Sequence, residues 1–174
     1  MDYKKKFRDI TSFIFDVDGV FTDGSITIME NGEMVRTMNT KDGYAVKAAL
    51  EEGFNIAVIT GGTNKAVKDR LNQLGVLNVY LGCHEKQSEL IKYSKKNSID
   101  LKKTIYMGDD IPDLPAMKIV GLSCCPKDSV QEVLDFADYV SHKNGGEGCV
   151  RDIIEQVLKV QGKWGKLKSA RITQ

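Results

Sequence analysis

The sequence predicts an α/β domain with a doubly wound parallel sheet, in which helices cover both faces of the sheet. Five short apolar runs recur along the chain, and the segments between them carry apolar residues at helical spacing. The 174 residues, 41% of them hydrophobic, suffice for one domain with a well-filled core. The expected strands are Ser12–Phe15, Asn55–Ile59, Val79–Leu81, Lys103–Met107 and Val120–Ser123.

The segments between the runs are suited to helices. Their apolar residues repeat every three or four positions, so that they share one face of a helix. We assign these side chains to the core rather than to a site. They are Ala45, Ala48 and Ala49, then Ala66, Val67, Leu71 and Leu74, and towards the end of the chain Val150, Ile153, Ile154, Val157 and Leu158.

A β-hairpin is expected between the first strand and the first helix of the repeating pattern. The segments Ser25–Met29 and Met34–Met38 flank an Asn-Gly dipeptide, which favours a tight turn between antiparallel strands. This hairpin, at about residues 24–38, should project from the domain. A single domain should extend over residues 1–162, and the basic tail 163–174, which lacks a long apolar stripe, should be disordered.

The composition argues against several classes of partner. Lysine and arginine total 25 against 24 aspartate and glutamate, so the net charge of +1 gives no overall field for nucleic acid or an anionic membrane. Neither a signal peptide nor a membrane-spanning apolar run is evident, which predicts a cytoplasmic protein that acts on a small molecule. Four cysteines without metal-binding spacing and two histidines leave carboxylates and lysine as candidate reactive groups.

The first apolar run is followed by an acidic pair, Asp16 and Asp18, and then by Gly19. Side chains two positions apart in an extended segment share a face, so both carboxylates should lie together at the carboxyl end of a buried strand. Two negative charges repel in that position unless a cation or a shared proton holds them. The pattern suggests Mg²⁺ beside a carboxylate nucleophile, although taken alone it fits a solvated turn equally well.

Further polar residues follow the other predicted strands, where ligands bind in doubly wound sheets. Thr60 closes the second run, Lys86 follows the third, and an acidic segment that includes Asp109 follows the fourth. A carboxylate nucleophile, metal ligands, and hydroxyl and ammonium donors are together what phosphoryl transfer needs. Each has an ordinary alternative, namely a strand-end hydroxyl, a solvated lysine or an acidic helix cap, but their succession at strand ends favours a site.

With the motifs DVDGVFTDG, ITGG, Lys86 and MGDDIPD in this order, the chain resembles the haloacid dehalogenase superfamily of phosphohydrolases. The resemblance implies Asp16 as the nucleophile that forms an aspartyl phosphate, and Asp18 as the acid for the leaving alkoxide and then the base for water. Because an acid needs a proton to deliver, the Asp18 side chain should sit off the metal. Thr60 and Lys86 would bind the transferred phosphoryl group. The implied Mg²⁺ ligands are Asp16, the backbone carbonyl of Asp18, and Asp109, with Asp110 and Asp113 in support.

The chain has no room for the cap domain that many members of this superfamily carry. The hairpin and one helix fill the segment from Asp18 to Thr60, and one helix and one strand fill the segment from Thr60 to Lys86. A capless site is open to water. We therefore expect a neighbouring subunit to help enclose the leaving group, with the hairpin as the assembly surface.

The finer pattern resembles the 3-deoxy-D-manno-octulosonate 8-phosphate (KDO 8-phosphate) phosphatases, small capless homotetramers of bacterial lipopolysaccharide synthesis. The hairpin, the segment NTKDGY, Arg70 and the segment GGEGCVR carry this resemblance. It implies Mg²⁺-dependent hydrolysis of a sugar-acid phosphate, with Gly145–Gly148 reaching a neighbouring subunit's site. The implied substrate contacts, which suit a carboxylate and hydroxyl groups, are Asn39, Thr40, Lys41, Asp42, Gly43, Lys47, Gly61, Gly62, Arg70 and Lys86.

Several alternatives stay open. On composition alone, Lys47 and Arg70 could be solvated helix residues, and Gly145–Gly148 a plain flexible loop. Many family members have arginine directly after Thr-Gly, whereas this chain has Gly62 and Thr63, so the nine-carbon analogue KDN 9-phosphate is a second candidate substrate. A phospho-accepting receiver domain shares the acidic cluster, threonine and lysine but keeps no acid two residues after its acceptor. A non-catalytic assembly module would not need these residues intact.

Overall fold

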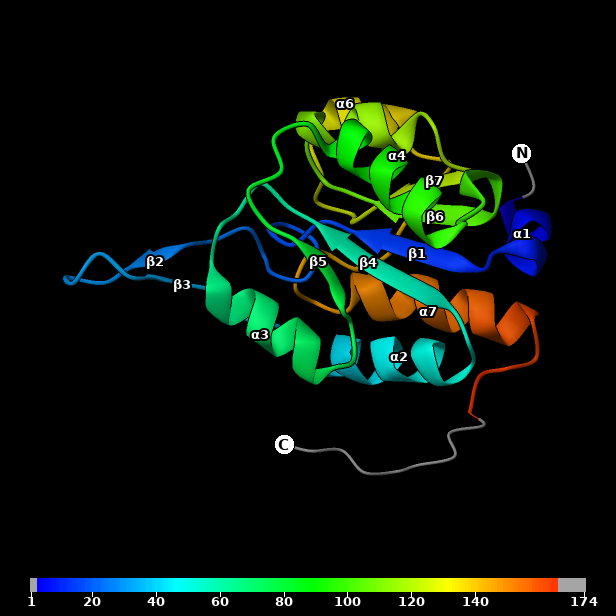
Figure 1. The fold of residues 1–174 in the computed structure, drawn as a ribbon, viewed down its shortest axis with the longest axis horizontal. Coiled ribbons are helices and arrows are strands. Elements are labelled where there is room, and N and C mark those ends of the chain that lie inside the picture. Colours follow the sequence, from blue (N-terminus) through cyan, green and yellow to red (C-terminus); the bar gives the residue numbers. More distant parts are fainter. Residues whose placement is uncertain (1–2, 166–174) are drawn as a thin grey trace.

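A six-stranded sheet forms the centre of the molecule (Figure 1). The computed structural model describes residues 3–165. The strand order across the sheet is β5-β4-β1-β6-β7-β8, and every neighbouring pair is parallel. All five predicted strands are present, with bounds shifted by at most two residues, and β8 was not predicted. The strands are β1 Ser12–Phe15, β4 Asn55–Ile59, β5 Asn78–Tyr80, β6 Thr104–Met107, β7 Leu122–Cys125 and β8 Tyr139–Val140.

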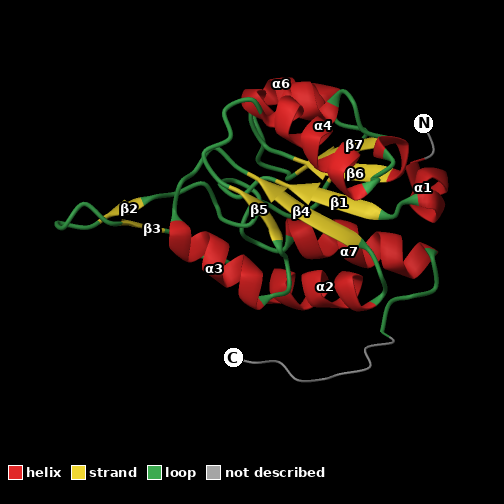
Figure 2. Ribbon diagram, viewed as in Figure 1, coloured by secondary structure: helices red, strands yellow, loops and turns green. Residues whose placement is uncertain are grey.

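Helices cover both faces of the sheet, as predicted. In Figure 2, α2 (Thr40–Glu51), α3 (Lys65–Gln73) and α7 (Cys149–Val160) lie on one side, and α4 (Lys86–Asn97) and α6 (Gln131–Phe136) lie on the other. Within residues 3–165, no helix has the length and apolar character that crossing a membrane would need. The remaining helical segments are short: α1 Tyr3–Lys6, α5 Leu114–Met117, and the 3-10 turns Phe7–Asp9, Leu101–Lys103 and Ile111–Asp113.

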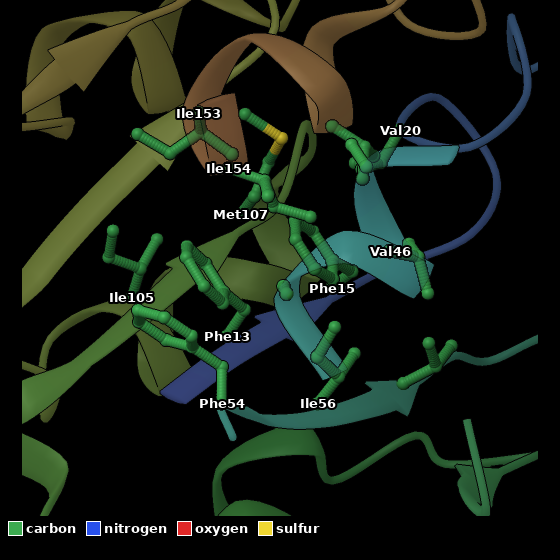
Figure 3. Packing of buried hydrophobic residues seen from close by; sticks show 14 of the residues in the cluster. Phe13, Phe15, Val20, Val46, Phe54, Ile56, Ile105, Met107, Ile153 and Ile154 are labelled. Carbon is green, nitrogen blue, oxygen red and sulfur yellow. The ribbon is translucent and has the colours of Figure 1, made fainter. Parts of the chain in front are cut away.

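The central strand β1 is buried on both faces and supplies both hydrophobic clusters of the domain. Phe13 and Phe15 belong to the larger cluster, whereas Ile14 belongs to the smaller one, as the alternation of side chains along a strand requires. Figure 3 shows Phe13 and Phe15 within the larger cluster, where their stacked rings have centroids 6.1 Å apart. This double burial explains the unbroken apolar run, and it fixes the point at which Asp16 leaves the sheet.

The expected hairpin is present and projects from the domain (Figure 1). Its strands β2 (Thr27–Ile28) and β3 (Met34–Val35) pair antiparallel, and the Met29 N–H donates to the Glu33 carbonyl at 2.9 Å. Regular pairing is confined to two residues on each strand, which is shorter than predicted. Both strands expose apolar side chains, and Ile28 is 74% exposed.

The last described residues pack against the domain. The Trp164 ring lies 5.8 Å from the Tyr44 ring, and the Arg151 guanidinium lies 5.5 Å from each of these two rings. The Lys163 ammonium lies 4.6 Å from the centre of the Phe54 ring. The predicted disordered tail included these two residues, which the structure places against the folded chain, and its remainder, 166–174, lies outside the described residues.

Candidate active site

A cleft of about 470 Å³ lies at the carboxyl ends of the strands β1, β4, β5 and β6. The arrows of β1 and β4 in Figure 1 point towards the side from which the hairpin projects, and the cleft lies at these strand ends. The predicted nucleophile, acid, threonine and lysine all contribute to its walls. The lining residues are Asp16, Asp18, Gly24, Thr60, Gly61, Gly62, Cys83, His84, Lys86, Asp109, Asp110, Pro112 and Asp113.

Asp16 and Lys86 form the buried ionic centre of the cleft. Lys86 is the first residue of α4, and its Nζ lies 2.7 Å from Asp16 Oδ2 and 2.7 Å from Asp113 Oδ1. The Val17 N–H donates to Asp16 Oδ1 at 2.7 Å, so the Asp16 carboxylate is held at both oxygens. The Asp16 side chain is 9% exposed, which leaves it reachable from the cleft.

Asp113 holds Lys86 and the loop after β6 through hydrogen bonds made in the interior of the domain. Its side chain is fully buried, and Oδ1 accepts from the Tyr106 hydroxyl at 2.8 Å as well as from Lys86. Its Oδ2 accepts from the Asp109 N–H at 3.2 Å and from the Asp110 N–H at 3.4 Å. Asp113 therefore positions Lys86 and the acidic loop together.

The carboxylates of this site repel one another. Burial raises the pKa of Asp16 to about 6, the Asp113 charge raises it too, and Lys86 opposes both effects. Burial also raises the pKa of Asp109 to about 7, with the charges of Asp16 and Asp113 adding to it. For Lys86, burial lowers the pKa, but the two neighbouring carboxylates outweigh this and raise it above the usual value. The site carries more negative than positive charge and would gain from a cation.

The donor set fits a magnesium ion. Carboxylate oxygens of Asp16, Asp109 and Asp113 lie within 4.8 Å of one another, a cluster that could hold a metal ion. Mg²⁺ takes oxygen ligands, and a divalent cation would relieve the repulsion that raises the pKa of Asp16 and of Asp109.

Gly19 allows the loop after β1 to approach the Asp109 carboxylate. Its φ is +82°, a left-handed conformation that L side chains rarely adopt. A Cβ at this position would overlap the Asp109 carboxylate. The glycine of the DVDG motif is therefore required by the close packing of two acidic loops.

Asp18 turns away from the carboxylate cluster and towards the base of the hairpin. Arg36 Nε lies 2.6 Å from Asp18 Oδ1, and Arg36 Nη2 lies 3.1 Å from Asp18 Oδ2. The Asp18 side chain is 31% exposed, and Asp18 lines the cleft. A carboxylate in this place can exchange a proton with a bound group without being a metal ligand through its side chain.

Thr60 lies at the end of β4 and is buried. Its backbone N–H donates to the Tyr80 carbonyl at 3.0 Å, and its carbonyl accepts from the Cys83 N–H at 2.9 Å, which ties the loops after β4 and β5 together. Its hydroxyl oxygen accepts from the Gly62 N–H at 3.2 Å. The hydroxyl hydrogen is available to donate to an anion in the cleft.

The predicted substrate contacts on α2 and α3 do not line the cleft of this chain. Asn39 caps α2, since its Oδ1 accepts from the Lys41 N–H at 3.0 Å, and its Nδ2 donates to the Gly146 carbonyl at 3.2 Å. Asp42 is fully buried, and its Oδ1 accepts from the Arg151 N–H at 2.7 Å at the start of α7. Asp42 thus caps a helix in the interior instead of facing a substrate, which corrects the expectation for this residue. The other residues of this group outside the cleft are Thr40, Lys41, Gly43, Lys47 and Arg70.

Sequence reasoning missed Arg36, Tyr106, Cys83 and His84. Tyr106 stands within an apolar strand, where its ring predicts core packing and gives no sign that its hydroxyl reaches Asp113. Cys83 and His84 lie three and two residues before Lys86, so their proximity to this motif was a usable signal for cleft residues. Arg36 carried no comparable signal, because its place depends on how the hairpin folds back.

Known proteins resemble this chain in both sequence and fold. A family model described as haloacid dehalogenase-like hydrolase matches residues 72–153. The 3-deoxy-D-manno-octulosonate 8-phosphate phosphatase of Salmonella typhi is 38% identical over 167 residues, which cover 96% of this chain and 89% of that protein.

Solved structures give the same result. The crystal structure of 3-deoxy-D-manno-octulosonate 8-phosphate phosphatase from Yersinia pestis superposes with a TM-score of 0.91 at 33% identity, covering 93% of this chain and 88% of that one. The enzyme of the same name from Moraxella catarrhalis, in complex with magnesium ion, phosphate ion and KDO, gives a TM-score of 0.89 at 32% identity and covers 92% of each chain. The chain therefore belongs to the 3-deoxy-D-manno-octulosonate 8-phosphate phosphatase family of the haloacid dehalogenase superfamily.

Proposed function

We propose that this protein is a Mg²⁺-dependent phosphatase that hydrolyses KDO 8-phosphate to KDO and inorganic phosphate, a step of lipopolysaccharide precursor synthesis. The observation that carries the proposal is the group formed in the cleft by the buried Asp16 and Lys86 and the half-buried Asp109. This group occurs in a chain that matches a relative of that name over 96% of its length. The Moraxella catarrhalis relative, which holds magnesium, phosphate and KDO, supports the choice of cofactor and substrate.

The chemistry follows from the two carboxylates of the first loop. The ionised Asp16 attacks phosphorus, the bond from phosphorus to the sugar oxygen breaks, and an aspartyl phosphate forms. Asp18 gives its proton to the leaving alkoxide and then takes one from the water that hydrolyses the aspartyl phosphate. Lys86 and Thr60 hold the equatorial oxygens of the phosphoryl group. Mg²⁺, held by Asp16 and Asp109 with Asp113 adjacent, supplies positive charge that offsets the phosphate.

The proposal includes self-association, with a homotetramer as the assembly. The exposed fractions of three apolar side chains on the hairpin are 74% for Ile28, 44% for Met34 and 43% for Val35. Apolar side chains gathered on an exposed surface mark a place where another surface binds. A second copy of the chain would cover them. Assembly would also bring the polar residues of α2 and α3 that are remote from their own cleft, among them Lys41 and Arg70, to the substrate of a neighbouring subunit.

The nine-carbon KDN 9-phosphate is the second candidate substrate, because Gly62 lines the cleft where many members of the family carry arginine. The two phosphates share the carboxylate and the phosphomonoester, so the same catalytic group would serve both. Only the ratio of their kcat/KM values separates the two assignments.

Steady-state hydrolysis of KDO 8-phosphate, KDN 9-phosphate and simple sugar phosphates, with and without Mg²⁺, tests the proposal. We expect KDO 8-phosphate to have the highest kcat/KM, and we expect EDTA and the variant Asp16→Asn each to abolish activity. The matched control is Asp9→Asn, because Asp9 is exposed and lies before the amino end of β1, away from the cleft. Full activity of Asp16→Asn, or indifference to EDTA, would contradict the chemistry. Faster turnover of KDN 9-phosphate would overturn only the substrate, and a monomer in sedimentation would overturn the assembly.

A further inference from the structure

One side chain of the hairpin turns back into the domain. Residues 23–37 are all exposed except Arg36, whose side chain is only 6% exposed. It ends in a small recess at the edge of the active-site cleft, whose walls include Val17, Thr60 and Leu81. A buried arginine side chain on an otherwise exposed hairpin calls for a partner, and that partner is Asp18.

The contact between Arg36 and Asp18 is made at two points. The Arg36 Nε–H donates to Asp18 Oδ1 at 2.6 Å, and the Nη2–H donates to Oδ2 at 3.1 Å. Such a fork fixes both the direction and the plane of a carboxylate, which a single contact from a lysine cannot do. The Asp18 carboxylate is held in this way beside the cleft and keeps a part of its surface exposed to it.

The base of the hairpin is itself fastened to the site. Asn64, the N-cap of α3, donates from Nδ2 to the Met34 carbonyl at 2.8 Å, and Arg36 Nη1 donates to the same carbonyl at 3.4 Å. Gly62 lies beside this pair, since a Cβ there would lie in ordinary van der Waals contact, 3.4 Å from Asp18 Oδ2 and 3.8 Å from Arg36 Nη2. The hairpin thus meets the loops after β1 and β4 at one place, and Arg36 is its link to Asp18.

We propose that Arg36 is a positioning residue for the reaction, which holds the Asp18 carboxylate in the orientation from which it exchanges protons with the leaving group and with water. The placement of the hairpin thereby controls the geometry of the proton-transfer step. This inference rests on the proposed function, since it takes Asp18 as the acid and base. Displacement of a catalytic group by about 1 Å can cost on the order of 100-fold in rate. Loss of the Arg36 contact that orients Asp18 should therefore lower the rate measurably.

A double-mutant cycle on kcat tests the proposal, with Arg36→Gln, Arg36→Lys, Asp18→Asn and the double variant Arg36→Gln with Asp18→Asn. We expect Arg36→Gln to lower kcat by about 10- to 100-fold with KM nearly unchanged, because a group that acts in the transition state affects kcat. Arg36→Lys should recover part of the loss. In the Asp18→Asn background, Arg36→Gln should cause no further loss, because its effect passes through Asp18. Glu33→Gln, an exposed charge on the same hairpin, is the matched control and should retain wild-type kcat.

The outcomes separate this inference from the proposed function. If Asp18→Asn keeps full activity, the role assigned to Asp18 fails and the inference with it. If Asp18→Asn is impaired but Arg36→Gln is not, or if Arg36→Gln lowers kcat equally in both backgrounds, only the inference fails. If the wild type does not hydrolyse KDO 8-phosphate, the substrate assignment fails, and the same cycle is measured with the simple sugar phosphate that is hydrolysed fastest, because its leaving alkoxide also needs a proton. A crystal structure of Arg36→Gln in which the Asp18 carboxylate keeps its orientation would overturn the inference whatever the substrate.

Discussion

The interior carboxylate Asp42 should make the stability of this protein depend on pH in a way that a single variant removes. Its side chain is fully buried, with Oδ1 on the Arg151 N–H at 2.7 Å, while Oδ2 has no hydrogen-bond partner among the described residues. Burial raises the pKa of Asp42 to about 6, against an ordinary value of 3.8. The folded state therefore favours the neutral carboxyl group.

The sign and size of the effect follow by linkage. Because the folded protein binds this proton more tightly than the unfolded chain, the stabilisation is complete below the unfolded pKa and is lost as pH rises through the folded pKa. The pKa difference corresponds to about 3 kcal/mol, of which about 2 to 3 kcal/mol falls between about pH 4 and pH 8. Asp42→Asn keeps an acceptor oxygen for the cap and cannot titrate, so any change that it makes in hydrogen bonding is the same at every pH.

Urea unfolding of the wild type and of Asp42→Asn, each in EDTA from about pH 4 to pH 8, measures the effect. Other carboxylates titrate in both proteins and cancel in the difference of their free energies of unfolding. We expect that difference to move by about 2 to 3 kcal/mol in favour of the variant as pH rises. Parallel curves would refute the reasoning, because they would mean that Asp42 is ionised in the folded protein at no cost.

Three further predictions concern the cleft. Gly19→Ala should weaken Mg²⁺ binding in titration calorimetry, because its Cβ would displace the Asp109 carboxylate. The control Gly32→Ala should bind Mg²⁺ normally, because Gly32 has the same φ of +82° but a Cβ there would have no atom within 4 Å. Mg²⁺ should raise the melting temperature more at about pH 8 than at about pH 5, since protons compete for Asp16 and Asp109, whose pKa values are about 6 and about 7. Without Mg²⁺, Lys86→Met should lose about 3 to 5 kcal/mol in urea unfolding, because it leaves the buried Asp16 carboxylate without its ionic partner.

Each of these has a result that would contradict it. Equal Mg²⁺ affinity in Gly19→Ala would show that Asp109 can move aside without cost. An equal shift in melting temperature at both pH values would mean that the carboxylates are already ionised at pH 5. For Lys86→Met the control is Lys92→Met on the same helix, because the Lys92 side chain is 72% exposed. An equal loss of unfolding free energy in both variants would show that the burial of the Asp16–Lys86 ion pair does not cause the loss.

The sequence was a good guide where one local pattern determines the structure. An apolar run buried on both faces, such as Ser12–Phe15, predicts a central parallel strand, and the residues that follow it must meet at the carboxyl edge of the sheet. The strand Tyr139–Val140 was missed because two residues give no periodicity, and only its pairing with β7 makes it a strand.

Contacts between distant segments could not be predicted in this way. Asp42 stands in a segment that resembles a substrate-binding motif, yet its partner is a backbone N–H 109 residues away. Arg36 is 18 residues from Asp18, and their contact depends on how the hairpin folds back over the loop after β4. The reactive residues at the strand ends could be predicted because the strands themselves fix where these residues lie. The contacts of Asp42 and Arg36 form only when distant segments of the chain come together in the fold.

The way in which the chain closes on itself has a consequence for its synthesis on the ribosome. The loop after β1 is completed by a segment more than 120 residues later, because the Gly146 N–H donates to the Val20 carbonyl at 3.0 Å and the Asn39 side chain donates to the Gly146 carbonyl. The strand β1, which Asp16 directly follows, pairs with β4 and with β6, which are both made after it. A nascent chain therefore cannot assemble the nucleophile, the metal ligands and the closing loop until Gly146 has left the ribosome. Products truncated before Gly146 should thus be unable to hydrolyse phosphate esters.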